Sequence, residues 1–179
     1  MNAVAAAAIA LDAEELATEV SRSSPDHGPR HWRDVARVGL EVADLNIDGE
    51  VLFLFAAIHD TQRHTEFADP DHGQRAADFM RTQELPITEA QSDVLHLALV
   101  SHDKGRLRDD PTIAACWDSD RLTLGRVGIS PSSLYISLAR VRSDMPKYVS
   151  GAERVMFSED LPWPHVADAY ARKFGWPDA

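Results

Sequence analysis

Apolar and polar positions along the chain follow helical rather than alternating spacing. Alternating runs of the kind that form strands are almost absent, and apolar residues recur three and four positions apart in most segments. His31, Val35, Val38 and Val42, for example, fall on one face of a helix. The pattern predicts an all-α fold, with helices over residues 3–21, 29–43, 50–60, 74–81, 88–101 and 112–124 and a further helix from Ser130. The expected N-caps of the last three are Thr88, Thr112 and Ser130.

The most apolar segment ends in two polar residues. Every residue from Val51 to Ile58 is apolar, so this helix is expected at the centre of the fold, and His59 and Asp60 follow it directly. Burying an imidazole or a carboxylate is costly unless a partner satisfies it. The pair either reaches solvent at an ordinary helix end or binds a metal ion. By itself it indicates little, because a chain of this composition contains about one His-Asp pair by chance and this chain contains two.

Other histidines and aspartates also end helices on or near their apolar faces. His31 begins one apolar face, His102 ends another, and Asp120 is flanked by apolar residues. Each has an ordinary alternative: a single histidine of this kind is usually a core residue, and Asp118 or Asp120 can cap a helix or pair with Arg121. Jointly, imidazole and carboxylate donors suit Zn, Fe, Ni, Co or Mn. A set without cysteine leaves positions open for water or substrate, unlike a structural zinc site.

Three segments in order resemble the HD-domain superfamily of metal-dependent phosphohydrolases: HGPRHWRDVARVGLEVA, VLFLFAAIHDTQR and CWDSDRLTLGRVG. The similarity covers about residues 26–130. It implies a single compact helical domain of the HD type, in which one metal ion is bound by His31, His59, Asp60 and Asp120. The family's first histidine precedes a valine by four residues, which selects His31 over His27. The family's last ligand is usually the second acid of its segment, so Asp118 is the fallback.

The resemblance also implies a second metal ion, bound by histidines between the HD pair and the final aspartate. His72 resembles the histidine that opens the helix after the HD loop, and His102 resembles the one that ends the following helix. His64 is a competing loop histidine. If His72 and His102 are metal ligands as in the family, Asp60 is expected to bridge two ions. The implied cofactor is one or two divalent transition-metal ions, of Mn, Fe, Ni, Co or Zn.

The activity that the resemblance implies is hydrolysis of a nucleotide or other small phosphate ester by a metal-activated water. Asp60 is expected to accept a proton from that water, with Arg63 and Lys104 beside it. Lys104, Arg106 and Arg108 are the candidate phosphate contacts, although loop cations are as often merely solvated. No glycine-rich phosphate loop is present. Two alternatives stay open: a di-iron HD-fold oxygenase, and a non-catalytic metal-binding or regulatory helical module.

Composition and charge narrow the partners. The 179 residues suggest one domain, with an N-terminal helix in 1–25, the HD-type core over about 26–130 and a helical extension over 131–179. The net charge of −11 disfavours binding to a nucleic acid duplex or an anionic membrane. We expect a soluble, cytoplasmic protein, because acids directly follow the apolar N-terminal run and the single Cys116 allows no internal disulfide. A homodimer stays open, as does packing of the C-terminal aromatics on the core or over the pocket.

Overall fold

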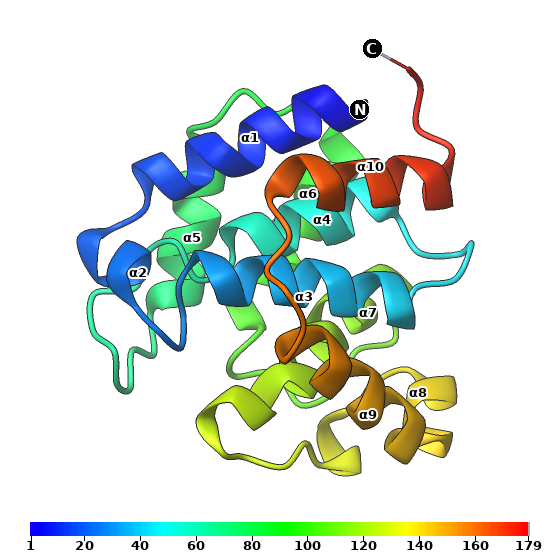
Figure 1. Cartoon of the computed structure of the whole chain (residues 1–179). Coiled ribbons are helices and arrows are strands. Elements are labelled where there is room, and N and C mark those ends of the chain that lie inside the picture. Colours follow the sequence, from blue (N-terminus) through cyan, green and yellow to red (C-terminus); the bar gives the residue numbers. More distant parts are fainter. Residues whose placement is uncertain (179) are drawn as a thin grey trace.

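The computed structural model describes residues 1–178, and every regular element in that part of the chain is helical. The predicted all-α fold is therefore confirmed. Figure 1 shows the helices gathered around α3 and α4, with the N- and C-termini near each other. In chain order the elements are α1 (Ala3–Leu16), α2 (Glu19–Ser23), α3 (Pro29–Val42), α4 (Gly49–Ile58), α5 (His72–Arg81), α6 (Glu89–Ser101), α7 (Pro111–Leu122), the 3₁₀ turns η1 (Thr123–Val127) and η2 (Ser133–Tyr135), α8 (Ala139–Ser143), α9 (Met145–Met156) and α10 (Trp163–Phe174).

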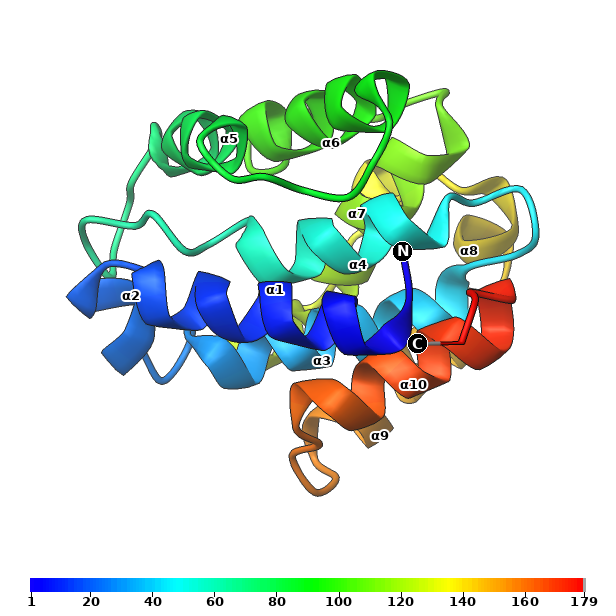
Figure 2. The ribbon, with the colours of Figure 1, turned by 90° about the horizontal axis from the view of Figure 1, so that it is seen from above.

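Helix α4 lies at the centre because it is apolar on all sides. Its residues from Val51 to Ile58 are at most 1% exposed, and it packs against α1, α3, α6 and α7. Figure 2 shows α4 enclosed between α1 and α6. Asp48 caps its N-terminus by accepting hydrogen bonds from the backbone N–H groups of Glu50 and Val51. His59 follows α4 directly and is buried as well, because the end of this central helix lies inside the fold.

A short helix that the pattern does not predict holds the turn after α4. The helix expected over 3–21 is interrupted, because Thr18 starts α2 by accepting a hydrogen bond from the backbone of Ser21. The Thr18 hydroxyl also donates to the carbonyl of Arg63 at 2.5 Å, and the Ser21 hydroxyl donates to the carbonyl of Asp60 at 2.7 Å. The prediction of one continuous helix is wrong at its C-terminal end, and the break lets α2 fix the residues around Asp60.

The N-terminus of α7 also differs from the prediction. Its cap is Asp110, whose carboxylate accepts hydrogen bonds from the N–H groups of Thr112 and Ile113 at 2.9 Å. Thr112 instead accepts with its hydroxyl from the backbone N–H of Asp48. The predicted cap Thr88 is confirmed, and it forms a complete capping box at the start of α6.

The helix predicted from Ser130 does not form. Residues 130–138 contain only the turn η2, and the backbone N–H groups of Ser137 and Leu138 donate to the two carboxylate oxygens of Asp118, each at 2.8 Å. The Asp118 carboxylate therefore holds this segment against α7. Hydrogen bonds to a distant residue outweigh the local Ser-Pro signal.

The C-terminal aromatics pack on the core and not over a pocket. Helix α10 packs on α1 and α3. Trp163, Tyr170 and Trp176 each meet the ring of Phe53 edge-on, with ring centroids 5.3, 5.2 and 5.9 Å away. His165 is exposed. Among the described residues, no helix has both the length and the apolar character needed to span a bilayer.

Candidate metal centre

The structure brings the predicted metal ligands together from five different helices. Each lies within about a turn of a helix end, so the packing of the helices sets their mutual positions. Five of them are buried and Asp120 is largely so. In chain order they are His31 at the start of α3, His59 and Asp60 after α4, His72 at the start of α5, His102 after α6 and Asp120 near the end of α7.

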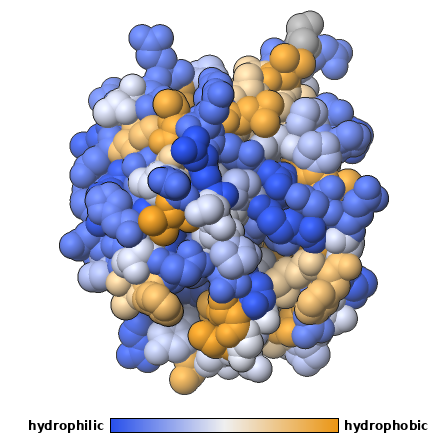
Figure 3. All heavy atoms as spheres, turned by 60° about the vertical axis from the view of Figure 1, so that its left-hand side comes forward, coloured by the Kyte–Doolittle hydropathy of each residue, from blue (hydrophilic) through white to orange (hydrophobic). Residues whose placement is uncertain are grey.

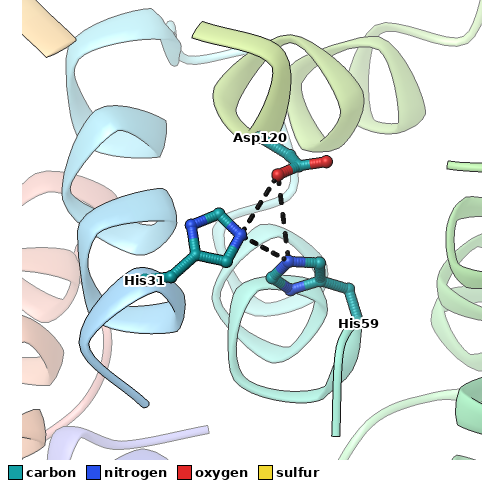
Figure 4. A group of neighbouring side chains, drawn as sticks. All are labelled: His31, His59 and Asp120. Carbon is teal, nitrogen blue, oxygen red and sulfur yellow. Dashed lines mark hydrogen bonds and ion pairs between the residues drawn. The ribbon is translucent and has the colours of Figure 1, made fainter. Parts of the chain in front are cut away.

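His31, His59 and Asp120 form one group of converging donors, the first triad (Figure 4). The Nε2 atoms of the two histidines are 3.2 Å apart. Oδ1 of Asp120 lies 3.3 Å from Nε2 of His31 and 3.9 Å from Nε2 of His59. Donors bound about 2.0–2.1 Å from one metal lie roughly 3.0–3.4 Å from each other. Two of the three separations lie in this range, and a small shift of the Asp120 carboxylate toward His59 would bring the third into it around a single ion.

Asp60, His72 and His102 form the second triad. The Nε2 atoms of His72 and His102 are 2.9 Å apart, and Oδ1 of Asp60 lies 3.2 and 3.8 Å from them. The first two separations are close to those of donors on one small metal ion, and the third is longer, as in the first triad. His64, the competing loop histidine, is exposed and belongs to neither triad.

The carboxylate of Asp60 faces both triads. Its Oδ1 belongs to the second triad, whereas its Oδ2 lies 3.8 Å from Nε2 of His31 and 3.7 Å from Nε2 of His59. A carboxylate with one oxygen toward each group of donors can bridge two metal ions about 3.5–4 Å apart. The geometry therefore offers two adjacent sites that share one ligand.

Backbone carbonyls determine which ring nitrogen of three histidines carries hydrogen. Nδ1 of His59, His72 and His102 lies 3.1, 2.5 and 2.8 Å from the carbonyl oxygen of the residue three positions earlier. Only an N–H can donate to such an acceptor, so Nε2 of each neutral ring is a bare lone pair. The 2.9 Å contact between Nε2 of His72 and His102 would then oppose two lone pairs. That contact needs a cation between the rings, either a proton or a metal ion.

Electrostatics keep the first triad in its metal-binding form. Burial and the nearby Arg126 cation lower the pKa of His31 to about 3, and burial lowers the pKa of His59 to about 4. Both rings are therefore neutral at pH 7 and keep a lone pair for a metal.

In the second triad, burial disfavours the ionised form of Asp60, but the surrounding imidazoles, His59 foremost, hold its pKa well below its usual value. Burial likewise opposes charged His102, but Asp60 outweighs it and raises the pKa of that ring.

Two shielded polar atoms of the first triad make no hydrogen bond to any described residue: Nδ1 of His31 and Oδ1 of Asp120. Leaving a buried acceptor without a partner is costly. Because Oδ1 of Asp120 faces the two imidazoles, a cation bound there would remove that cost. The nitrogen and oxygen donors of both triads fit one or two divalent transition-metal ions.

The loop that carries His72 is held by Asp69, a residue that the sequence pattern does not single out. The Asp69 carboxylate accepts hydrogen bonds from the backbone N–H of His64 at 2.7 Å and from the Arg75 guanidinium at 2.6 Å. These bonds outweigh burial and lower the pKa of Asp69 to about 2. Its backbone carbonyl is the acceptor for Nδ1 of His72. Asp69 therefore fixes the orientation of a second-triad ligand.

A cavity of about 400 Å³ opens onto both triads and is lined in part by Arg63 and Lys104. Arg63 is buried, with Nη1 3.4 Å from Oδ1 of Asp60 and Nη2 donating to the carbonyl of Phe67 at 2.8 Å. The Lys104 side chain is half exposed and lies 3.7 Å from the carboxylate of Asp71. Of the four cations predicted beside Asp60 or the phosphate, Arg63 and Lys104 thus already have protein partners.

The other candidate phosphate contacts lie elsewhere. Arg106 and Arg108 are exposed and are not among the residues that line the cavity. The guanidinium of Arg108 lies over the ring of Trp117, 5.4 Å from its centroid. Asp118, the fallback metal ligand, uses both carboxylate oxygens to hold residues 137–138.

Two further residues at the cavity are functional candidates: Arg126, which sequence reasoning missed, and His27, which the resemblance set aside in favour of His31. Arg126 donates from Nε to the carbonyl of Asp26 at 2.7 Å, and its Nη2 lies 4.0 Å from Oδ1 of Asp120. His27 lines the cavity with Nδ1 3.2 Å from Oδ2 of Asp60. Arg126 stands within the third segment quoted above, six residues after Asp120, and its place in that segment is the only sequence signal for it.

The centre combines two adjacent groups of metal donors, a shared carboxylate, fixed cations and a cavity for a small molecule. Such an arrangement can bind an anionic substrate, bring it beside metal-bound water and exclude bulk solvent.

No family model, curated protein or solved structure matches this chain.

Proposed function

We propose that the chain is a metal-dependent phosphohydrolase of the HD-domain type, which cleaves a small phosphate ester with water at a two-ion centre. The observation that carries the proposal is the position of Asp60, with one carboxylate oxygen toward each triad. Two ions bridged in this way, about 3.5–4 Å apart, are characteristic of phosphatases and nucleases. The order of the ligands along the chain, which resembles the HD-domain superfamily, supports the same reaction class.

The two ions would lower the pKa of a water from about 15.7 towards 7 and neutralise charge on the phosphoryl group. The neutral imidazoles of the first triad and the ionised Asp60 are the donors that would hold them. Arg63, 3.4 Å from Oδ1 of Asp60, fixes that carboxylate and balances its charge. Asp60 lies between the triads and is the candidate acceptor of the water proton.

Charge that builds on the phosphoryl oxygens needs fixed positive groups, because catalysis of this reaction is mostly positioning and electrostatics. Arg126 provides one, since its guanidinium is held by backbone carbonyls beside the first triad. Lys104 provides a second, more mobile charge at the cavity. The remaining phosphate contacts predicted from the sequence, Arg106 and Arg108, would need loop movement to reach the substrate.

Elemental analysis of the purified protein, followed by phosphate-release assays with Mn, Fe, Co, Ni and Zn, tests the proposal. We expect up to two ions per chain and release of phosphate that depends on the metal. Asp60→Asn removes the negative charge of the carboxylate that faces both triads, and it should abolish both metal binding and hydrolysis. The same substitution at the exposed Asp93 of α6 is the matched control and should change neither.

A chain that contains no metal and binds none when reconstituted would overturn the centre itself. A chain that binds two ions but releases phosphate from no ester would overturn the reaction class. In that second case, bound iron together with oxygen consumption would favour the di-iron oxygenase alternative.

A further inference from the structure

The outer wall of the cavity differs in character from its floor. Beyond the triads, the lining includes three apolar side chains from the segment after α7, namely Leu124, Ile129 and Tyr135. Ile129 and Tyr135 are 54% and 46% exposed. Figure 3, which brings the left-hand side of Figure 1 forward, shows apolar patches among hydrophilic surface at the lower end of the molecule, where the segment after α7 lies. The cavity therefore joins an ionic floor to an apolar rim.

The apolar rim has a fixed position relative to the metal donors. Arg121 is buried and donates from Nη1 to the carbonyl of Tyr135 at 2.5 Å, while Asp118 holds the backbone of residues 137–138. Both side chains come from α7, the helix that also carries Asp120. One rigid helix thus sets the distance between a metal ligand and the rim, as a specificity pocket requires.

The positive charge at the floor suits a single phosphoryl group. Arg126 is held through Nε and Nη1, and its Nη2 lies 3.5 Å from Nδ1 of His27 and 4.0 Å from Oδ1 of Asp120, two residues that line the cavity. Arg63 is committed to Asp60 and to a backbone carbonyl. Apart from the proposed ions, Arg126 and the half-exposed Lys104 are then the cations that can face the substrate, which suits one phosphoryl group better than a chain of two or three.

Size limits the rest of the substrate. The cavity volume of about 400 Å³ lies near the lower end of the range of roughly 300–1,000 Å³ for small-molecule sites. Part of that volume is taken by the phosphoryl group at the floor. A compact group, of about the size of an aromatic ring with a short linker, would fill the remaining space along Leu124, Ile129 and Tyr135.

We propose, on the basis of the proposed function, that the substrate is a phosphate monoester with a compact apolar leaving group, and that Leu124, Ile129 and Tyr135 determine this specificity. Hydrolysis adds the oxygen of water to phosphorus and breaks the bond between phosphorus and the ester oxygen. The ester oxygen takes up a proton and leaves as an alcohol, and inorganic phosphate is the second product. Apolar contacts with the leaving group favour such esters over those of polar alcohols.

A kinetic comparison tests the specificity in the metal-loaded protein. Benzyl phosphate and glycerol 1-phosphate have leaving alcohols of similar acidity but opposite polarity. We expect kcat/KM to be about tenfold or more higher for benzyl phosphate, and lowest for a nucleoside triphosphate. The double variant Ile129→Ser/Tyr135→Ser should remove most of the preference. The control Leu134→Ser changes an exposed leucine of the same turn that does not line the cavity, and it should keep the preference.

A binding measurement gives a readout independent of turnover. Calorimetry with benzylphosphonate and 2-hydroxyethylphosphonate, which cannot be hydrolysed, should show about tenfold tighter binding of the benzyl compound to the wild type. The double variant should bind the two equally, and Leu134→Ser should behave as the wild type.

The outcomes separate this inference from the function it rests on. Metal-dependent hydrolysis of all esters without preference would overturn the apolar specificity and leave the phosphohydrolase standing. A preference that survives in the double variant would overturn the role of the rim residues. If no ester is cleaved, the proposed function fails, and equal binding of the two phosphonates would overturn the apolar specificity as well.

Discussion

The two triads use the same kinds of donor but are positioned by different parts of the molecule. The first triad lies on α3, α4 and α7, three helices that pack on one another in the core. The two histidines of the second triad belong to α5 and α6. Helix α5 packs mainly on α6, α6 packs on α4 and α7 as well, and His72 also depends on the loop before it. Core packing therefore sets the geometry of the first triad, whereas a hydrogen-bonded loop contributes to the second.

The largest effect is expected from removing a first-triad ligand. His31→Ala should eliminate the ion of the first triad and lower phosphate release on the order of 10³-fold, because the remaining donors cannot hold the ion beside Arg126. Metal content and initial rates measure the two effects. Retention of both ions in this variant would show that His31 is a core residue and not a ligand.

A smaller and more selective loss is expected in the second triad. His102→Ala removes a donor that lies 2.9 Å from His72 and should leave one ion per chain, held by the first triad. The rate of hydrolysis should fall on the order of 10²-fold, since one ion and the shared carboxylate remain. Loss of both ions would contradict the separate positioning of the triads.

The loop dependence of the second triad can be tested without touching a ligand. Asp69→Asn weakens the bonds to Arg75 and His64 and should lower the affinity for the second ion about 10–100-fold, with no change at the first. Metal titration by calorimetry measures both affinities. Asp71→Asn is the control, because Asp71 is exposed in the same loop and makes no capping hydrogen bond. Equal weakening of both ions by Asp69→Asn would refute the comparison.

The smallest effect is expected far from the centre. Asp160 holds the linker before α10 through Arg33, and this bond lowers the pKa of Asp160 below its ordinary value of 3.8. Because the folded pKa is the lower one, the stabilisation is present above pH 3.8 and is lost as the pH falls through the folded pKa. Asp160→Asn should therefore cost about 0.5–1 kcal/mol at neutral pH and nothing at low pH, as denaturant unfolding would show. Altered metal content in this variant would contradict the account.

The burial of most triad residues could be predicted because their signals are local. His59 and Asp60 end an uninterrupted apolar run, and His31 and His102 lie on apolar helix faces, so helical periodicity alone indicates where their side chains point. Asp120 and His72 are instead selected by the resemblance of their segments to the HD-domain superfamily. These residues need only correct helices and a packed core to meet.

The rim and the supporting residues could not be predicted, because their partners are distant in sequence. Ser130 and Pro131 are a typical start of a helix, yet Asp118 accepts hydrogen bonds from the backbone 19 and 20 residues further on, and the segment forms only the turn η2. Arg126 is held by the carbonyl of Asp26, 100 residues away. Asp69 acts through a side-chain bond to Arg75 that no periodic pattern encodes.

The central claim is that Asp60 joins two metal sites. The most direct test is a crystal structure of the metal-loaded protein with data collected on both sides of the metal absorption edge. If Asp60 joins two sites, two anomalous peaks will lie about 3.5–4 Å apart, one in each triad, with one Asp60 oxygen bound to each. No peak at the triads, or a single peak that does not touch Asp60, would contradict it.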